Sequence, residues 1–268
     1  MNIKSLINNL IAPHKIPFKI INKFIFLYKK NTYKQAIYEN DQNLIFKHFN
    51  LKRDDALKKL SILKKQYSLL NRSMSSEHEV LCSALSISDK KINKILEIGT
   101  YDGMNSYLLS LLFKDAKIKT IDLSSETDDF KDYYNRTNNV FDFVKKRNLI
   151  LSKNNRIFFE EINSINLYKS DEKFDLIWID GAHGYPVVCM DIINALRLIA
   201  DDGIVMCDDI YINKITLDKM YQSTAAYETL EELANEKIIE YKLIYKRLDV
   251  VNNCDENKRK FVGIFRKI

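Results

Sequence analysis

The chain has 268 residues, enough for one large domain or for one domain with an appendage. Hydrophobic residues make up 46% of it and charged residues 29%, which excludes a disordered chain and a membrane-embedded bundle. Residues 1–70 hold 14 of the 42 Lys and Arg but only four of the 36 Asp and Glu. Their net charge is therefore +10, and that of the remainder is −4. A mildly acidic main part argues against a protein whose main surface grips nucleic acid.

The cysteines and the N-terminus bear on the compartment. Four isolated cysteines form no C-x-x-C pair and indicate small core residues of a reducing environment. The sequence shows no secretory signal, and the longest early apolar run, residues 24–28, is too short to span a bilayer. We therefore expect a cytoplasmic protein.

Residues 1–74 are predicted to form a basic, amphipathic helical extension. Ile16, Ile20, Phe24 and Leu27 recur at helical spacing, and residues 51–70 repeat the pattern with paired lysines. The preferred interpretation is an extension packed on the main domain or on a second subunit, which would make a homodimer. Contact with an anionic membrane surface and a nucleic-acid clamp are the alternatives.

From residue 75 onward, short apolar runs alternate with helical stretches. A capped helix is predicted to begin at Ser76. Five strands are then predicted at residues 94–99, 117–122, 156–159, 174–180 and 203–209. Helices are predicted at residues 104–113, 129–149, 187–200 and 217–235, and two last strands at 238–250 and 260–268, joined by a polar loop at 252–259.

This alternation predicts an α/β fold for residues 75–268. We expect a Rossmann-like, doubly wound and mostly parallel seven-stranded sheet that ends in a C-terminal antiparallel hairpin. In such sheets, ligands bind at the carboxyl ends of the strands. Those ends carry Glu97 and Gly99, Asp122, Asn163 and Ser164, Asp180, and Asp208 and Asp209.

The loop after the first strand, residues 97–103, indicates the kind of ligand. It lacks the second and third glycines of G-x-G-x-x-G, and Tyr101 and Asp102 would put bulk and negative charge where a pyrophosphate sits. Asp122 lies at the distance along the chain at which an acidic residue accepts hydrogen bonds from ribose hydroxyls. We infer a nucleoside ligand without phosphates that carries a positive group.

Four motifs in this order carry a resemblance to a known family. They are Glu97-x-Gly99-x-x-x-Gly103, the segments 121–124 and 174–183, and the segment 202–209. Residues 75–268 resemble class I S-adenosylmethionine-dependent methyltransferases, and most of all the small-molecule O-methyltransferases with an IDGxHxY-type motif, here residues 179–185. Residues 1–70 lie outside this resemblance.

The resemblance implies S-adenosylmethionine as cofactor and a role for each loop. Glu97 would lie by the methionine amino group, and Asp122 would accept from the ribose hydroxyls. The cofactor-binding residues would be Glu97, Gly99, Thr100, Tyr101, Gly103, Asp122, Asn163, Ser164 and Asp180. Asn163 and Ser164 would flank the adenine, although the aspartate that is frequent after the third strand of the family is missing here.

Asp180, Asp208 and Asp209 form a candidate metal site. If the fourth and fifth strands are neighbours, three carboxylates meet there, and carboxylate oxygens suit Mg²⁺ or another divalent cation. The group resembles the site of catechol-type O-methyltransferases, where a metal lowers the pKa of the substrate hydroxyl. The alternative is that Asp180 and Asp209 orient the substrate directly while Asp208 points away.

His183 and Asp180 are the candidate catalytic residues. A neutral imidazole in the glycine-flanked loop could take the proton of a hydroxyl as methyl transfer proceeds. The leading hypothesis is methyl transfer to a hydroxyl of a small molecule, such as a sugar or a polysaccharide precursor. The rivals are a nucleic-acid methyltransferase, which the absence of an NPPY-like tetrad disfavours, and a non-catalytic adenosyl-ligand module with a docking arm.

Overall fold

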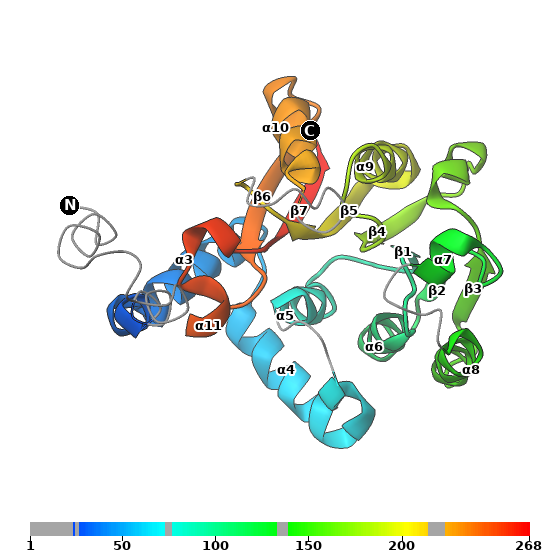
Figure 1. The fold of residues 1–268 in the computed structure, drawn as a ribbon, viewed down its shortest axis with the longest axis horizontal. Helices are drawn as coiled ribbons and strands as arrows, with labels where there is room; N and C mark the ends of the chain where they lie inside the picture. Colours follow the sequence, from blue (N-terminus) through cyan, green and yellow to red (C-terminus); the bar gives the residue numbers. More distant parts are fainter. Residues whose placement is uncertain (1–23, 25–26, 73–76, 133–138, 214–222) are drawn as a thin grey trace, which may run out of the picture.

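The computed structural model describes residues 24, 27–72, 77–132, 139–213 and 223–268 (Figure 1). Its centre is one sheet of seven strands in the order β3-β2-β1-β4-β5-β7-β6. The strands are β1 (Lys94–Ile98), β2 (Lys117–Asp122), β3 (Ile157–Glu161), β4 (Phe174–Ile179), β5 (Ile199–Ile210), β6 (Ile239–Tyr245) and β7 (Phe261–Lys267). Strands β1 to β5 pair in parallel, and β7 is antiparallel to both β5 and β6. The expected doubly wound, mostly parallel sheet with a C-terminal hairpin is confirmed.

The helices cover both faces of this sheet (Figure 1). They are α3 (Gln35–His48), α4 (Arg53–Gln66), α5 (Glu77–Leu85), α6 (Met104–Leu112), α7 (Asp128–Asp132), α8 (Val140–Leu151), α9 (Val187–Leu198), α10 (Ala225–Asn235) and α11 (Val250–Asn253). Short 3-10 turns are η1 (Ser68–Arg72), η3 (Ser164–Lys169) and η4 (Glu256–Lys258). Within the described ranges, no helix combines the length and the apolarity that crossing a bilayer requires.

Alternation along the central strands divides the core in two. In β4, Leu176 and Trp178 belong to one cluster, whereas Ile177 and Ile179 belong to the other. Successive strand residues point to opposite faces, so a continuous apolar run serves two helical layers at once. The first cluster lies under α4, α5 and α6, and the second lies under α9 and α10. Trp178 is 1% exposed and is a core residue.

Several predicted boundaries were wrong. The helix expected at residues 129–149 is two helices, α7 and α8, and residues 133–138 between them lie outside the described part. The strand expected at 238–250 ends at Tyr245, because Asp249 caps α11 by accepting from the Asn252 amide at 3.0 Å. The loop expected at 252–259 therefore contains the end of α11 and η4. Of the helix expected at 217–235, the structure describes α10, whereas residues 217–222 are not described.

Helices α3 and α4 pack on the main domain. Phe46, Leu51, Ala56 and Leu60 belong to the same core cluster as α5 and α6. The expected helical periodicity at Ile16 and Ile20 falls outside the described residues. The boundary at residue 74, the membrane contact and the homodimer stay predictions.

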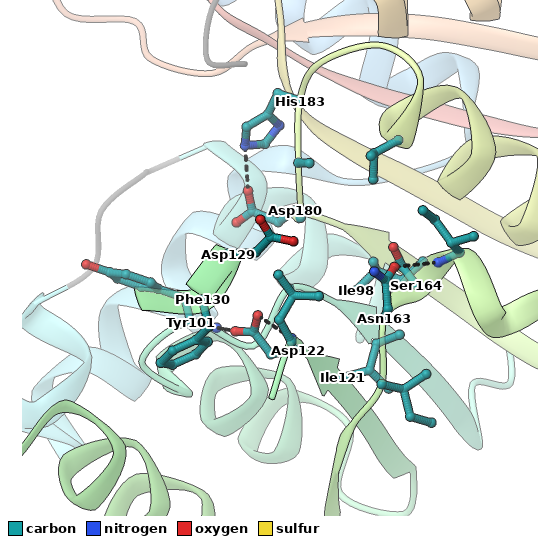
Figure 2. Close-up of a pocket in the computed structure, with 17 residues that line it drawn as sticks. Ile98, Tyr101, Ile121, Asp122, Asp129, Phe130, Asn163, Ser164, Asp180 and His183 are labelled. Atoms are coloured by element: carbon teal, nitrogen blue, oxygen red, sulfur yellow. Dashed lines mark hydrogen bonds and ion pairs between the residues drawn. The ribbon is translucent and has the colours of Figure 1, made fainter. Parts of the chain in front are cut away.

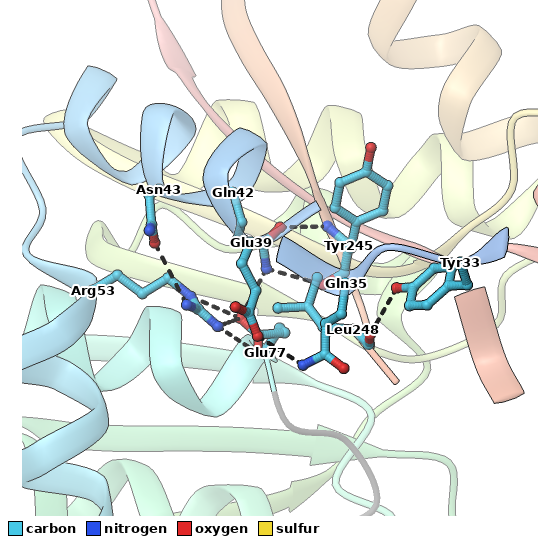
Figure 3. Close-up of polar contacts among 9 residues, drawn as sticks. All are labelled: Tyr33, Gln35, Glu39, Gln42, Asn43, Arg53, Glu77, Tyr245 and Leu248. Carbon is cyan, nitrogen blue, oxygen red and sulfur yellow. Dashed lines mark hydrogen bonds and ion pairs between the residues drawn. The ribbon is translucent and has the colours of Figure 1, made fainter. Parts of the chain in front are cut away.

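A buried polar cluster joins these helices to the sheet (Figure 3). The Gln42 side chain, 0% exposed, donates to Glu77 Oε2 at 2.8 Å and to the Tyr245 carbonyl at 3.1 Å, and it accepts from the Tyr245 amide at 2.8 Å. Arg53 forms an ion pair with Glu77 at 3.0 Å. Because Tyr245 ends β6 and Glu77 begins α5, this cluster fixes both elements at the edge of the candidate site.

Candidate active site

Two adjoining cavities open at the carboxyl ends of β1, β2, β4 and β5. The β2-side cavity, of about 160 Å³, extends from Gly99 past Asp122 to η3. The hairpin-side cavity, of about 290 Å³, extends from Glu97 to the residues that flank the β6–β7 hairpin. Four residues line both cavities: Gly99, Tyr101, Asp180 and His183. The expected site residues are thus brought together, and these four lie at the border between the two compartments.

The loop after β1 requires glycine where it passes β4. Gly99 has φ +97°, and a Cβ there would lie 2.2 Å from the backbone oxygen of Asp180. A side chain would therefore block the close approach of the two strand ends. Gly103 has φ +79° and forms the N-cap of α6, where it packs against Leu151. Gly103 lines neither cavity, and its contact with the cofactor stays a prediction.

Asp122 braces the same loop from the end of β2 (Figure 2). Its Oδ2 accepts from the Tyr101 amide at 2.9 Å, and its Oδ1 accepts from the Leu123 amide at 2.8 Å. Tyr101 itself has φ +48°, a conformation that is rare for residues other than glycine. The carboxylate thus holds a strained turn at the wall of the β2-side cavity.

The lining of the β2-side cavity is mainly apolar. Asn163 and Ser164 line it, as expected, and Asn163 caps η3 by accepting from the Ile165 amide at 3.1 Å. Four further lining residues were not anticipated from the sequence: Asp129, Phe130, Ile162 and Ile165. Phe130 is 1% exposed and lies on α7, a five-residue helix that was hidden inside a longer predicted one. A flat aromatic base would suit such walls.

Glu97 is a buried carboxylate in a polar nest. It is 1% exposed and accepts from Asn105 Nδ2 at 2.8 Å, from Thr120 Oγ1 at 2.5 Å and from the Ser106 hydroxyl. Thr100, another expected site residue, is buried beside it and hydrogen-bonds Thr120 at 2.7 Å. Burial raises the pKa of Glu97 to about 7, although these hydrogen bonds oppose the shift. A cation bound at this position would restore the ionised form.

Asp180 and His183 lie at the border of the two cavities (Figure 2). The distance from His183 Nε2 to Asp180 Oδ1 is 3.6 Å. Desolvation and the nearby carboxylate of Asp208 raise the pKa of Asp180 well above its ordinary value. Burial lowers the pKa of His183, against the pull of Asp209, and so favours the neutral imidazole that a general base requires. Tyr185, the last residue of the expected motif, is 78% exposed and lines neither cavity.

Asp208 and Asp209 lie in the hairpin-side cavity, but they face lysines. Lys246 Nζ lies 2.5 Å from Asp208 Oδ2 and also contacts Asp209 Oδ1, and Lys260 Nζ lies 2.7 Å from Asp209 Oδ2. In the part of the chain that the structure describes, no group of three or more His, Cys, Asp or Glu is placed to hold a metal ion. The ammonium groups of Lys246 and Lys260 thus contact the carboxylate oxygens of Asp208 and Asp209, and the divalent-cation site stays a prediction.

Other residues of the hairpin-side cavity were unforeseen or only partly foreseen. Lys246 and Lys260 flank the last two strands, and nothing in their local sequence distinguishes them from the chain's many other lysines. His78 and Glu79 of α5 also line this cavity. His78 stacks on Trp178 at a centroid distance of 5.1 Å.

Comparisons with known proteins concern the fold and the type of domain. Residues 96–210 match a family model described as a methyltransferase domain. No curated protein matches the chain by sequence. The fold and the family model agree over this segment: residues 96–210 are similar to a methyltransferase domain, and they lie in the mostly parallel sheet described above.

Among solved structures, the chain is similar to the O-methyltransferase TomG from Streptomyces achromogenes, in complex with S-adenosylmethionine. The identity is 16%, the TM-score is 0.53, and the match covers 88% of this chain and 99% of that one. The O-methyltransferase from Bacillus cereus, in complex with S-adenosylhomocysteine, shares 15% identity at a TM-score of 0.51, over 88% and 100% of the two chains. The S-adenosylhomocysteine-bound methyltransferase PaMTH1 of Podospora anserina shares 18% identity at a TM-score of 0.50. The match covers 94% of this chain and 98% of that one. At these identities the likeness concerns the fold.

Proposed function

We propose that this protein transfers the methyl group of S-adenosylmethionine to a hydroxyl of a small molecule. The observation that carries the proposal is the pair of adjoining cavities with Gly99, Tyr101, Asp180 and His183 at their border. The β2-side cavity suits adenosine, and the hairpin-side cavity suits the acceptor. A methyl group at the border would then lie between its donor and the acceptor oxygen.

The charges of the site support a cationic cofactor. Burial raises the pKa of Glu97 to about 7, and it also raises the pKa of Asp180, so a positive neighbour would stabilise the ionised form of both carboxylates. S-adenosylmethionine brings an ammonium group and a sulfonium. In the proposed complex, Glu97 holds the ammonium and Asp122 meets the ribose, while Asn163 and Ser164 lie at the adenine end.

The polar character of the hairpin-side cavity supports a hydroxyl-rich acceptor, such as a sugar or a polysaccharide precursor. Two of its lining residues, Asp208 and Asn105, each have a buried Oδ1 atom without a hydrogen-bond partner among the described residues. Buried acceptors of this kind are costly unless a ligand or water donates to them. Sugar hydroxyls could supply such donors.

The chain's own residues perform the reaction in a single displacement. His183 takes the proton of the acceptor hydroxyl as the oxygen attacks the methyl carbon. The carbon–sulfur bond breaks with its electron pair staying on sulfur, which leaves S-adenosylhomocysteine and a methyl ether. Asp180 lies within 3.6 Å of the imidazole and stabilises its protonated form.

Calorimetric titration with S-adenosylhomocysteine, with and without EDTA, tests the cofactor assignment. We expect micromolar binding to the wild type, loss of binding in Asp122→Ala and retention in Asp180→Ala. A panel of hydroxylated small molecules, read by release of S-adenosylhomocysteine, then tests the reaction, with Asp180→Ala and His183→Ala as inactive controls. Absence of binding to the wild type would overturn the proposal. Binding without turnover of any hydroxylated compound would favour a non-catalytic adenosyl-ligand module.

A further inference from the structure

An irregularity in β5 brings two consecutive carboxylates to the same side. The register between β5 and β7 shifts between Cys207 and Ile210, and Asp209 has φ +53°. In a regular strand, Asp208 and Asp209 would point to opposite faces of the sheet. Here both contact the ammonium of Lys246. The bulge in β5 and the left-handed conformation of Asp209 allow both carboxylates to reach the same ammonium group. Backbone irregularities of this kind are typical of functional sites.

The two ammonium groups belong to lysines at the two ends of the connection between β6 and β7. Lys246 directly follows β6 and Lys260 directly precedes β7, and the Lys246 amide donates to the Lys260 carbonyl at 2.9 Å. This backbone bond holds the two lysines side by side opposite the bulge. The Lys246 side chain is 9% exposed and that of Lys260 is 30% exposed. Both belong to the lining of the hairpin-side cavity, together with His183.

The charges of this group are nearly balanced without any added ion. Burial alone would lower the pKa of Lys246, but Asp208, Asp209 and Asp180 raise it above the ordinary lysine value. Burial opposes ionisation of Asp209 as well, and the two lysines nevertheless hold its pKa below the usual range. Lys246 is therefore an ammonium ion at neutral pH. Asp209 is a carboxylate whose two oxygens are each taken by a lysine.

A divalent cation does not fit this arrangement. Mg²⁺ requires about six oxygen ligands at about 2.1 Å in near-octahedral geometry. Its candidate ligands on Asp208 and Asp209 already accept hydrogen bonds from Lys246 and Lys260. An ion bound to the same carboxylates would lie next to two ammonium groups and would be repelled by both.

We propose that Lys246, supported by Lys260, takes the place that a divalent cation would have at this site. The inference rests on the proposed function and specifies how the acceptor oxygen is stabilised. Two of the three N–H donors of Lys246 go to Asp208 and Asp209, so the third can donate to the acceptor oxygen in the hairpin-side cavity. As the proton passes to His183, the ammonium stabilises the negative charge that develops on that oxygen. Methyl transfer would then be independent of metal.

Metal binding tests the proposed role of Lys246 in the absence of any methyl acceptor. Mn²⁺ alone is titrated into the full chain and followed by electron paramagnetic resonance. We expect no binding to the wild type in the millimolar range. An ammonium group about 4 Å from a divalent ion repels it. Even at the dielectric constant of water, removing that ammonium group should strengthen binding of the ion about thirtyfold. Lys246→Met and Lys260→Met should therefore each gain Mn²⁺ binding, and Lys246→Arg, which keeps the charge, should not.

Lys242→Met is the matched control, because Lys242 lies on β6 but is exposed. If Lys246→Met does not fold, because Asp208 is left without its partner, Lys260→Met carries the test with a more exposed side chain. Tight Mn²⁺ binding by the wild type would overturn the proposal, and so would failure of the folded lysine variants to gain binding. S-adenosylhomocysteine titrated into the same proteins reports on the cofactor site separately. The lysine inference and the proposed function can therefore fail independently.

Discussion

Binding of S-adenosylhomocysteine should weaken about fivefold when the pH falls from 7 to 6. Glu97 must be ionised to hold the ligand's ammonium group, and burial raises its pKa to about 7 in the free protein. About half of the molecules carry the ionised form at pH 7, but only about one in eleven carry it at pH 6. Between pH 7 and pH 8 the gain should be less than about twofold, because ionisation is then nearly complete.

The affinity should rise with pH because the pKa of Glu97 is raised in the free protein. A carboxyl whose pKa is raised in the free protein, and lowered again by the bound cation, releases a proton on binding, so affinity rises with pH through the free-state pKa. Asp180 also has a raised pKa and lies near enough to interact with Glu97, so it can only steepen the dependence. Burial lowers the pKa of His78 and of His183, which favours the neutral imidazole at both residues.

Calorimetry at pH 6, 7 and 8 in two buffers of different ionisation enthalpy measures both the affinity and the proton released. Glu97→Gln should bind at least about tenfold more weakly at pH 8, the effect of losing a charged hydrogen bond, with a shallower pH dependence. Glu160→Gln, at a carboxylate outside both cavities, should behave as the wild type. Equal pH dependence in Glu97→Gln and the wild type would refute the reasoning.

Two further predictions concern the frame of the site. Gly99→Ala should abolish ligand binding and lower the melting temperature by several degrees. Residue 99 has a left-handed backbone conformation, and a Cβ there would lie 2.2 Å from the Asp180 carbonyl oxygen. Unchanged calorimetric binding and an unchanged melting temperature would contradict this prediction. Gln42→Ala should cost about 2–4 kcal/mol in urea unfolding, because it breaks three buried hydrogen bonds to Glu77 and Tyr245. Gln35→Ala, which removes an exposed Gln35–Glu39 bond, should cost less than about 0.5 kcal/mol, and equal losses would show that the buried cluster is not what joins α3 to the sheet.

Local pattern alone was enough for most of the sheet. The predicted strand at residues 117–122 coincides with β2, and those near β1 and β4 differ from the structure by one residue. Buried parallel strands are short apolar runs bounded by polar residues, and this signal depends only on neighbours in sequence. The position of the site followed as well, because the carboxyl ends of parallel strands meet at one edge.

The predicted lengths and ends of strands and helices were less accurate where a local side-chain contact competed with the hydrophobic pattern. Residues 246–250 continue an apolar and polar alternation that a strand would also show, but the Asp249 side chain caps a helical turn there. The five-residue helix α7 was absorbed into a longer prediction, and with it the cavity residue Phe130 was missed. A single hydrogen bond or turn decides such boundaries, and composition does not contain it.

The sequence by itself determined the class of fold, the edge of the sheet at which the two cavities open, and the acidic residues gathered there. Only the tertiary structure decided what balances their charge. Strand β7 enters between β5 and β6, and this order sets Lys246 and Lys260 opposite Asp208 and Asp209. The partners are 38 and 51 residues apart, so no local spacing relates them. Three carboxylates at one strand edge call for a cation, but whether a metal or an ammonium group supplies it depends on strands that pair later in the chain.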